Sequence, residues 1–214
     1  MSHGIDLYVK GDFEGAIREF SRALGLSPYS EFTNDATKYL ADTYLKLGKP
    51  DKAITAYKKS IRLNPTRDDT HIKLGNLYFG LDRYEDAYKE YREAVRINPD
   101  ANNSFSLGQA CLRLDRLNEA EGCFSQVRRL EPQKPDGDYG LGLVYSKQGR
   151  YEKAVEHFRK AIRLDKDFYD AYAEMGYAFM DMGEPDEAKA ILEFLDQKDP
   201  TRAFTLSRYI YRVD

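Results

Sequence analysis

Three histidines and two cysteines are the residues whose side chains could bind a metal ion or act as a nucleophile. The histidines are His3, His71 and His157, and none lies in an HExxH pattern or in another cluster with metal-ligand spacing. We expect His71 to pack in or at the rim of the core. His157 stands between charged neighbours and is expected on a solvated helix face. The spacing of these residues therefore predicts no metal site.

The two cysteines, Cys111 and Cys123, fall on successive predicted helices, at or beside packing positions. We expect buried, inert thiols there, and two cysteines are too few for a disulfide framework, so a reducing compartment is the simplest interpretation. Paired carboxylates such as Asp68 and Asp69 stand at helix starts, where the helix dipole favours negative charge. No Gly-rich phosphate-binding motif occurs. The chain is therefore predicted to have no catalytic residues and no cofactor, and not to be an enzyme.

The composition is that of a folded chain with a large surface. Of its 214 residues, 42% are hydrophobic and 32% are charged, which is too apolar for a disordered chain. The net charge of −3 provides no basic field and argues against a nucleic-acid partner. No apolar run approaches the roughly 20 residues of a membrane span, and no signal peptide is recognisable. We expect a cytoplasmic protein, with the periplasm left open because the sequence begins inside a repeat and an upstream signal would then be missing.

A motif recurs along the chain with nearly constant spacing. Six segments place an alanine at the same point of a predicted helix, and successive alanines are 37, 34, 33, 34 and 34 residues apart. These alanines are Ala16, Ala53, Ala87, Ala120, Ala154 and Ala188. Four residues after each alanine comes a large side chain: Phe20, Tyr57, Tyr91, Phe124, Phe158 and Leu192.

Another predicted helix precedes each of the last five copies and carries an apolar residue followed by a small one. These pairs are Leu40-Ala41, Leu74-Gly75, Leu107-Gly108, Leu141-Gly142 and Met175-Gly176. Twelve residues after the alanine, five of the six copies have a proline, and Lys166 is the exception. The prolines are Pro28, Pro65, Pro99, Pro132 and Pro200.

This series of positions resembles the tetratricopeptide repeat, whose pattern is W-x2-L-G-x2-Y…A-x3-F…P. The similarity covers nearly the whole chain, from Gly4 to about Pro200. The resemblance implies an all-α fold, a right-handed α-α superhelix (solenoid) of helical hairpins. The opening Trp of the pattern is absent from every copy, and its place is taken by Thr37, His71, Ser104, Asp138 and Tyr172.

Elementary packing accounts for the pattern. Apolar residues at helical spacing give each helix one stripe, and Gly or Ala at the crossing lets two backbones approach to the near end of the ~8–10 Å interaxial range. Gly48, Gly149 and Gly183 are expected to end first helices in a left-handed conformation, and Asp82 and Asp115 to do the same where no Gly stands. A single hairpin cannot bury its own stripe, so neighbouring hairpins must stack.

The register of the repeats predicts a single solenoid over residues 1–214. A truncated first repeat occupies 1–28, and repeats follow at about 34–65, 68–99, 101–132, 135–167 and 169–200, with a capping helix at about 202–213. In that helix Leu206, Tyr209, Ile210 and Val213 follow helical spacing and are expected to cover the last repeat. The spacing of 37 residues predicts a longer loop around Ser27–Asp35.

In the family that this chain resembles, the first helix of each unit lines an inner, concave wall. We expect asparagine and glutamine there to hydrogen-bond a peptide backbone, aromatic residues to act as apolar anchors and cations to pair with acidic groups. The aromatic residues equally suit packing between adjacent units, and both interpretations stay open. The predicted groove residues are Lys38, Lys73, Asn76, Phe79, Phe105, Gln109, Arg113, Tyr139, Lys147 and Tyr177.

One subclass of the family grips a terminal carboxylate with lysine, asparagine and arginine side chains. Lys38 matches the first lysine of that arrangement, but Asp42 stands where an asparagine is expected. Ser106 and Gly140 do not supply the other expected side chains. The chain is therefore not assigned to that subclass.

The sequence thus predicts a non-catalytic scaffold or adaptor that binds an extended peptide or a helix of another protein in its concave groove. One alternative is a regulatory or substrate-docking module of a larger enzyme or of an envelope assembly machine. Another is a self-associating structural protein, which would form a homo-oligomer.

Overall fold

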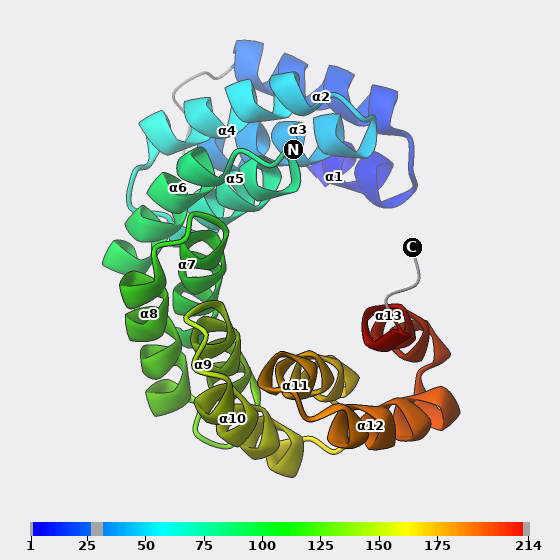
Figure 1. The fold of residues 1–214 in the computed structure, drawn as a ribbon. Helices are drawn as coiled ribbons and strands as arrows, with labels where there is room; N and C mark the ends of the chain where they lie inside the picture. The colour runs from blue at the N-terminus through cyan, green and yellow to red at the C-terminus, as the bar shows by residue number, and fades with distance from the viewer. Residues whose placement is uncertain (1, 27–31, 212–214) are drawn as a thin grey trace. The chain divides into compact units, whose positions relative to one another are not determined.

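The computed structural model describes residues 2–26 and 32–211. These two ranges consist of α-helices joined by short turns, with no β-strand, so the predicted all-α class is confirmed (Figure 1). Two compact units are present, Met1–Pro99 (unit 1) and Asp100–Asp214 (unit 2), and each is described by itself. A bilayer crossing needs a longer and more apolar helix than any found in the described ranges.

Unit 1 contains three helical hairpins. In each hairpin a first helix (α1, α3 or α5) packs against a second helix (α2, α4 or α6), and α2 and α4 also pack against the first helix that follows them. The first helices form one layer and the second helices another (Figure 1). The helices are α1 (Ser2–Val9), α2 (Phe13–Leu26), α3 (Thr33–Lys46), α4 (Pro50–Leu63), α5 (Asp68–Gly80) and α6 (Tyr84–Ile97).

Unit 2 repeats this arrangement with three more hairpins and one further helix. Helix α13 packs against both α11 and α12, with Leu206 and Ile210 buried and Tyr209 largely exposed. Val213, which was expected to join this contact, lies outside the described residues. The helices are α7 (Ala101–Arg113), α8 (Leu117–Leu130), α9 (Asp136–Lys147), α10 (Tyr151–Leu164), α11 (Tyr169–Met182), α12 (Pro185–Lys198) and α13 (Pro200–Tyr211).

The turns inside the hairpins have the backbone conformation that their residues predict. Gly48, Gly149 and Gly183 have φ angles of 65°, 70° and 78°. Asp82 and Asp115 take the same role with φ angles of 57° and 58°. A left-handed residue at this point ends the first helix and reverses the chain, and aspartate adopts this conformation more readily than most residues with a side chain.

The helices of a hairpin approach most closely where the sequence pattern places its small residues. A Cβ atom added to Gly75 would lie 2.5 Å from Tyr91, and one added to Gly142 would lie 2.4 Å from Phe158. Gly108 faces Phe124 in the same way. The six repeated alanines are all fully buried. In these three hairpins the ring four residues after the alanine thus occupies the space that a missing Cβ leaves on the first helix.

The last hairpin departs from this arrangement. A Cβ atom on Gly176 would meet Leu206 of α13 at 2.8 Å, so the close contact comes from the additional helix and not from Leu192 of α12. Leu192 is only half-buried and lies at the edge of the contact between α12 and α13. The side chain of Leu192 is shorter than the aromatic rings of the other hairpins, and α13 supplies the contact with Gly176 instead.

Two acid–imidazole pairs each include the residue that stands where the repeat pattern has its Trp. His71 Nδ1 lies 2.8 Å from Glu90 Oε2, and His157 Nδ1 lies 2.7 Å from Asp138 Oδ1. The histidine lies on the first helix in one hairpin and on the second helix in the other. Both pairs nevertheless link a first helix to a second helix. The solvated position expected for His157 is wrong: its residue is only 8% exposed, because the imidazole partners the buried carboxylate of Asp138. His71 is buried, as predicted.

The start of α3 also departs from expectation. The longer loop predicted around Ser27–Asp35 falls mainly on residues 27–31, which lie outside the described residues, as does Pro28. Thr33–Asp35 form the first turn of α3 rather than a loop. Polar residues such as Asn34 and Asp35 suit a first turn as well as a loop, so composition alone did not distinguish the two.

A matched pair of glycine substitutions tests the crossing. We expect Gly142→Ala to lower the free energy of unfolding by about 1–2 kcal/mol, because the new Cβ would overlap the buried ring of Phe158. Gly122→Ala, at an exposed position in the middle of α8, should instead raise it by about 0.5–1 kcal/mol through helix propensity alone, since no atom lies within 4 Å of its added Cβ. Urea denaturation followed by circular dichroism measures both changes, and a stabilised Gly142→Ala variant would contradict the packing described here.

Candidate protein-binding site

A cavity of about 460 Å³ lies on the layer of first helices in unit 1. In either unit, the layer formed by the first helices is called the first-helix face below. In α3 and in α5 the second and third lining residues follow the first by three and four positions, so they share one side of that helix. The cavity is lined by Tyr8 of α1, by Asp42, Leu45 and Lys46 of α3, by Tyr57 of α4, and by Lys73, Asn76 and Leu77 of α5.

The carboxylate of Asp42 is fully engaged at the base of this cavity. Tyr57 donates its hydroxyl to Asp42 Oδ1, and Lys73 Nζ lies 2.5 Å from Asp42 Oδ2. Burial, together with the hydrogen bond to Asp42, raises the pKa of Tyr57, so the hydroxyl stays a donor. The negative charge of Asp42 is therefore neutralised by Lys73 and does not repel an incoming acidic group as strongly as the sequence suggested.

Hydrogen-bond donors remain available at the mouth of the cavity. The hydroxyl of Tyr91 donates to Asn76 Oδ1 over 2.7 Å, which orients the amide of Asn76. Asn76 is exposed, and its Nδ2 group donates to no acceptor among residues 2–26 and 32–211. Lys46 is also exposed. The opening thus presents an amide N–H and ammonium groups and is suited to carbonyl or carboxylate oxygens.

Lys38 is mostly buried and forms an ion pair within the protein. Its Nζ lies 2.7 Å from Asp69 Oδ2, and its side chain is only 13% exposed. Burial of Asp69 opposes ionisation, but hydrogen bonds from Lys38 and Arg67 outweigh it and lower the pKa of this carboxyl to about 2. The pair links α3 to α5, so Lys38 stabilises the stack of hairpins.

The predicted aromatic residues are half-buried and contact other rings. Phe79 packs edge-on to Tyr84 with 5.2 Å between ring centroids, and Phe105 packs edge-on to Phe124 at 5.6 Å. Tyr139 lies between two phenylalanines, 4.8 Å from Phe168 and 6.0 Å from Phe158, and Tyr177 lies 5.0 Å from Tyr209. Each of these residues is therefore engaged in packing and remains partly exposed.

The remaining predicted residues, Gln109, Arg113 and Lys147, are exposed on the first helices of unit 2. That unit has a cavity of about 450 Å³ at its C-terminal end, lined by Tyr177, Thr205, Arg208 and Tyr209. Three of these four residues belong to α13, which the sequence pattern indicated only as a cap. Arg208 and Tyr209 follow Thr205 by one turn of an amphipathic helix, and this spacing could have indicated that the three residues share one face.

Six of the eight residues that line the unit 1 cavity are absent from the predicted groove residues, and Tyr8 and Tyr57 illustrate why. Tyr8 follows Gly4 by four residues, as Phe79 follows Gly75, so the register of the repeats could have revealed it. Tyr57 was assigned to packing only, because no sequence pattern shows that its hydroxyl reaches past the crossing to Asp42.

Glu174 is an unexpected acidic group on the first-helix face of unit 2. It lies on α11, is half-buried, and makes no hydrogen bond or ion pair with the described residues. Burial first, and the nearby charge of Asp170 second, raise its pKa to about 7. Asp170 itself is paired with Arg202 of α13 at 2.7 Å, so Glu174 is left without a cation.

Two features of the described residues bear on metal and thiol chemistry. No group of three His, Cys, Asp or Glu side chains within them is placed to hold a metal ion. Cys111 is fully buried and hydrogen-bonded to Cys123, and this contact together with burial raises the pKa of the Cys111 thiol. A thiol held in its neutral form is a poor nucleophile, whereas the same contact lowers the pKa of the partly buried Cys123 thiol.

Fold, turn glycines and helix crossings together define a solenoid of tetratricopeptide repeats. The family model described as "Cilia and flagella-associated protein 70 C-terminal domain" matches residues 8–203, and the chain belongs to this family. The predicted resemblance is thereby confirmed.

Similar proteins agree with this assignment. The chain is 28% identical over 200 residues to the Hsp70-Hsp90 organizing protein of Triticum aestivum, covering 91% of this chain and 34% of that protein. A tetratricopeptide repeat protein from Parabacteroides merdae superposes with a TM-score of 0.86 at 18% identity, over 98% of this chain and 83% of the other. YrrB, described as "a TPR protein with an unusual peptide-binding site", superposes with a TM-score of 0.67 at 17% identity, over 88% and 97%.

The curated relatives are much longer than the matched region. The chain spans 9–34% of the length of eight such proteins, so their whole activities do not transfer to it directly.

Glu174 gives this region a pH dependence. A carboxyl whose folded pKa is raised stabilises the fold fully below its unfolded pKa of about 4.3, and this contribution is lost as the pH rises toward 7. Glu174→Gln removes the charge and keeps the shape, so its free energy of unfolding should exceed that of wild type by roughly 1–3 kcal/mol at pH 8 and by much less at pH 5. Urea denaturation at both pH values measures this. An exposed control, Glu193→Gln, should show little change, and a Glu174→Gln effect that is equal at the two pH values would contradict the assignment.

Proposed function

We propose that this chain is a non-catalytic adaptor that binds an extended segment of another protein on its first-helix face. In unit 1 the segment lies over the cavity between α1, α3 and α5. Its backbone carbonyl groups accept hydrogen bonds from Asn76, and an acidic side chain or terminal carboxylate pairs with Lys46.

The excess of donors at this cavity is the observation that carries the proposal. Asp42 is already saturated by Tyr57 and Lys73, while the Asn76 amide is oriented by Tyr91 and exposed. A preoriented donor costs less entropy on binding than a freely rotating one. Extended peptides present a carbonyl oxygen at every residue, so this arrangement favours a peptide over a ligand without regularly spaced acceptors.

The first-helix face of unit 2 suits a ligand segment that differs in chemistry from the one proposed for unit 1. Its cavity joins the edge of Tyr177 to Arg208 and Tyr209 of α13, and the uncompensated carboxyl of Glu174 lies on the same helix as Tyr177. A bound peptide with an apolar side chain next to a basic one would suit this face, because the cation of the peptide would keep the Glu174 carboxyl ionised. YrrB, which shares this fold, is described as having a peptide-binding site, and this supports the general type of function.

Selection of peptides from a random library against the full chain, followed by fluorescence anisotropy, tests the proposal. Asn76→Asp keeps the oxygen that accepts from Tyr91 but replaces the N–H donor with a negatively charged acceptor. We expect this variant to bind the selected peptides about tenfold or more weakly. The loss corresponds to one hydrogen bond to a carbonyl or charged group together with the repulsion of the new charge.

Asn118→Asp is the matched control, because it makes the same chemical change at an exposed position on the second helix α8. It should leave the affinity unchanged. Peptides that bind Asn76→Asp as tightly as wild type, or no selectable peptide at all, would contradict this function.

Self-association is the second candidate, supported by the outer side of α13. Phe204 is 63% exposed there, beside a cavity of about 440 Å³ that Leu192 and Ala203 help to line. Apolar groups in such a place favour contact with another protein surface. If this surface joins two copies, sedimentation velocity will show a concentration-dependent dimer that Phe204→Ser abolishes; a monomer at all concentrations excludes this candidate.

A further inference from the structure

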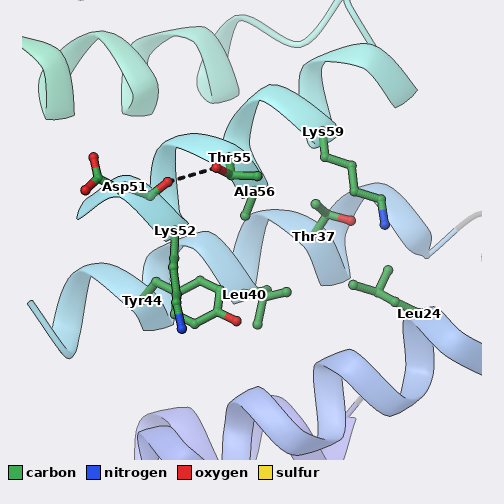
Figure 2. Close-up of a pocket in the computed structure, with 9 residues that line it drawn as sticks. All are labelled: Leu24, Thr37, Leu40, Tyr44, Asp51, Lys52, Thr55, Ala56 and Lys59. Atoms are coloured by element: carbon green, nitrogen blue, oxygen red, sulfur yellow. Dashed lines mark hydrogen bonds between the residues drawn. The ribbon is translucent and has the colours of Figure 1, made fainter. Parts of the chain in front are cut away.

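A second cavity opens on the opposite layer of unit 1, between the second helices α2 and α4. Its volume is about 370 Å³. Figure 2 shows Leu40 and Tyr44 of α3 at its floor, Leu24 of α2 on one side and the α4 side chains on the other. None of the groove residues predicted from the sequence takes part. The lining residues are Leu24, Thr37, Leu40, Tyr44, Asp51, Lys52, Thr55, Ala56 and Lys59.

Two small side chains leave this space open. Thr37 takes the place of the Trp in the repeat, and Ala56 stands three residues after the repeated alanine, opposite to it. The corresponding pairs are larger in three of the four later hairpins: His71 with Glu90, Asp138 with His157 and Tyr172 with Ile191. The cavity therefore follows from a local departure from the repeat pattern.

The floor of the cavity is apolar and incompletely covered. Leu40 and Tyr44 are both half-buried, whereas the same positions of the next hairpin, Leu74 and Tyr78, are only 0% and 2% exposed. Burial of such a floor by a partner's apolar side chains is favourable at about 25 cal/mol per Å² of apolar surface removed from water.

Two lysines form the rim on α4. Lys52 and Lys59 are exposed and seven residues apart, which corresponds to two helical turns or roughly 10 Å along the axis. Lys52 Nζ lies 5.8 Å from the ring centroid of Tyr44, and neither lysine forms an ion pair with a carboxylate in the described part of the chain.

The one acidic residue of the rim is directed elsewhere. The carboxylate of Asp51 points away from the cavity in Figure 2, and its negative charge acts on Arg83 of the next hairpin. Its backbone carbonyl accepts a hydrogen bond from Thr55 Oγ1 at 2.9 Å. The rim therefore offers two uncompensated positive charges above an apolar floor.

From this geometry we infer that the groove between α2 and α4 binds an acidic amphipathic helix of a partner protein. Leucine-like side chains at positions i+3 and i+4 of that helix enter the cavity, and carboxylates at i and i+7 pair with Lys52 and Lys59. The two-turn spacing of the lysines matches the spacing of carboxylates on such a helix. A single-headed aliphatic carboxylate would engage only one lysine, so the pair of charges favours the helix.

A designed helical peptide is the probe for this site. It is alanine-rich, about 15 residues long so that a helix can form, and carries Glu, Leu, Leu and Glu at i, i+3, i+4 and i+7 with a fluorescent label. We expect saturable binding to the full chain by anisotropy, weakened at high salt. Replacing both leucines with serine, or both glutamates with lysine, should abolish it.

Variants of α4 locate the binding. Lys59→Glu should weaken the peptide by about tenfold, because it replaces attraction by repulsion. Ala56→Leu should abolish binding by filling the cavity. The matched control Lys58→Glu reverses the adjacent charge, whose ammonium lies over Tyr78 of the next hairpin, and should leave the affinity within about twofold. Circular dichroism melting verifies that each variant is folded.

Several results would overturn the inference. These are no binding up to about millimolar peptide, equal binding to wild type and Lys59→Glu, or binding of dodecanoate but not of the peptide, which would indicate a lipid-type site. Asn76→Asp, on the opposite layer, should leave the designed helix bound as in wild type. This site can therefore succeed or fail independently of the proposed function.

Discussion

Each hairpin depends on the close approach of its two helices at one crossing, where the first helix has no side chain or only a methyl group. The rings of Tyr91, Phe124 and Phe158 occupy the space left by Gly75, Gly108 and Gly142, at distances that exclude even a Cβ atom. Protein interiors tolerate little overlap or void, so this contact determines the separation and rotation of the two helices. The repeated alanines, all fully buried, serve the same approach from the second helix.

The same crossing determines what each layer presents to a partner. Once the stripe of a first helix is committed to packing, the residues next to it in the sequence face away from the crossing, and in unit 1 they include Asn76 and Lys73. Tyr91 belongs both to the crossing and to the surface, because its ring fills the space beside Gly75 and its hydroxyl orients the amide of Asn76. On the opposite layer, a pair of small residues at the place of the missing Trp opens the cavity between α2 and α4. Packing positions and binding positions are therefore neighbours in the repeat, and a change in one alters the other.

Local rules predicted the parts of the fold that depend on single residues. The left-handed conformations of Gly48 and Asp82 follow from the restricted conformations of residues that carry a Cβ, so the sequence was sufficient. Contacts between residues of different helices were harder to predict. Lys38 pairs with Asp69 thirty-one residues away, and His157 is buried because Asp138 requires a partner. Helical periodicity indicates which side of a helix is apolar, but it does not show which polar side chains meet across a hairpin. Likewise, the contact between Leu206 and Gly176 could not be predicted, because it depends on how α13 packs against α11.

The contact of glycine with an aromatic ring is the central claim, and NMR measures it directly. The account predicts nuclear Overhauser effects between the α protons of Gly75, Gly108 and Gly142 and the ring protons of Tyr91, Phe124 and Phe158, respectively. It also predicts ring-current shifts of these α protons, while Gly122, which has no neighbouring ring, should show neither. Random-coil shifts and missing cross-peaks at the three crossing glycines in the folded protein would contradict the account.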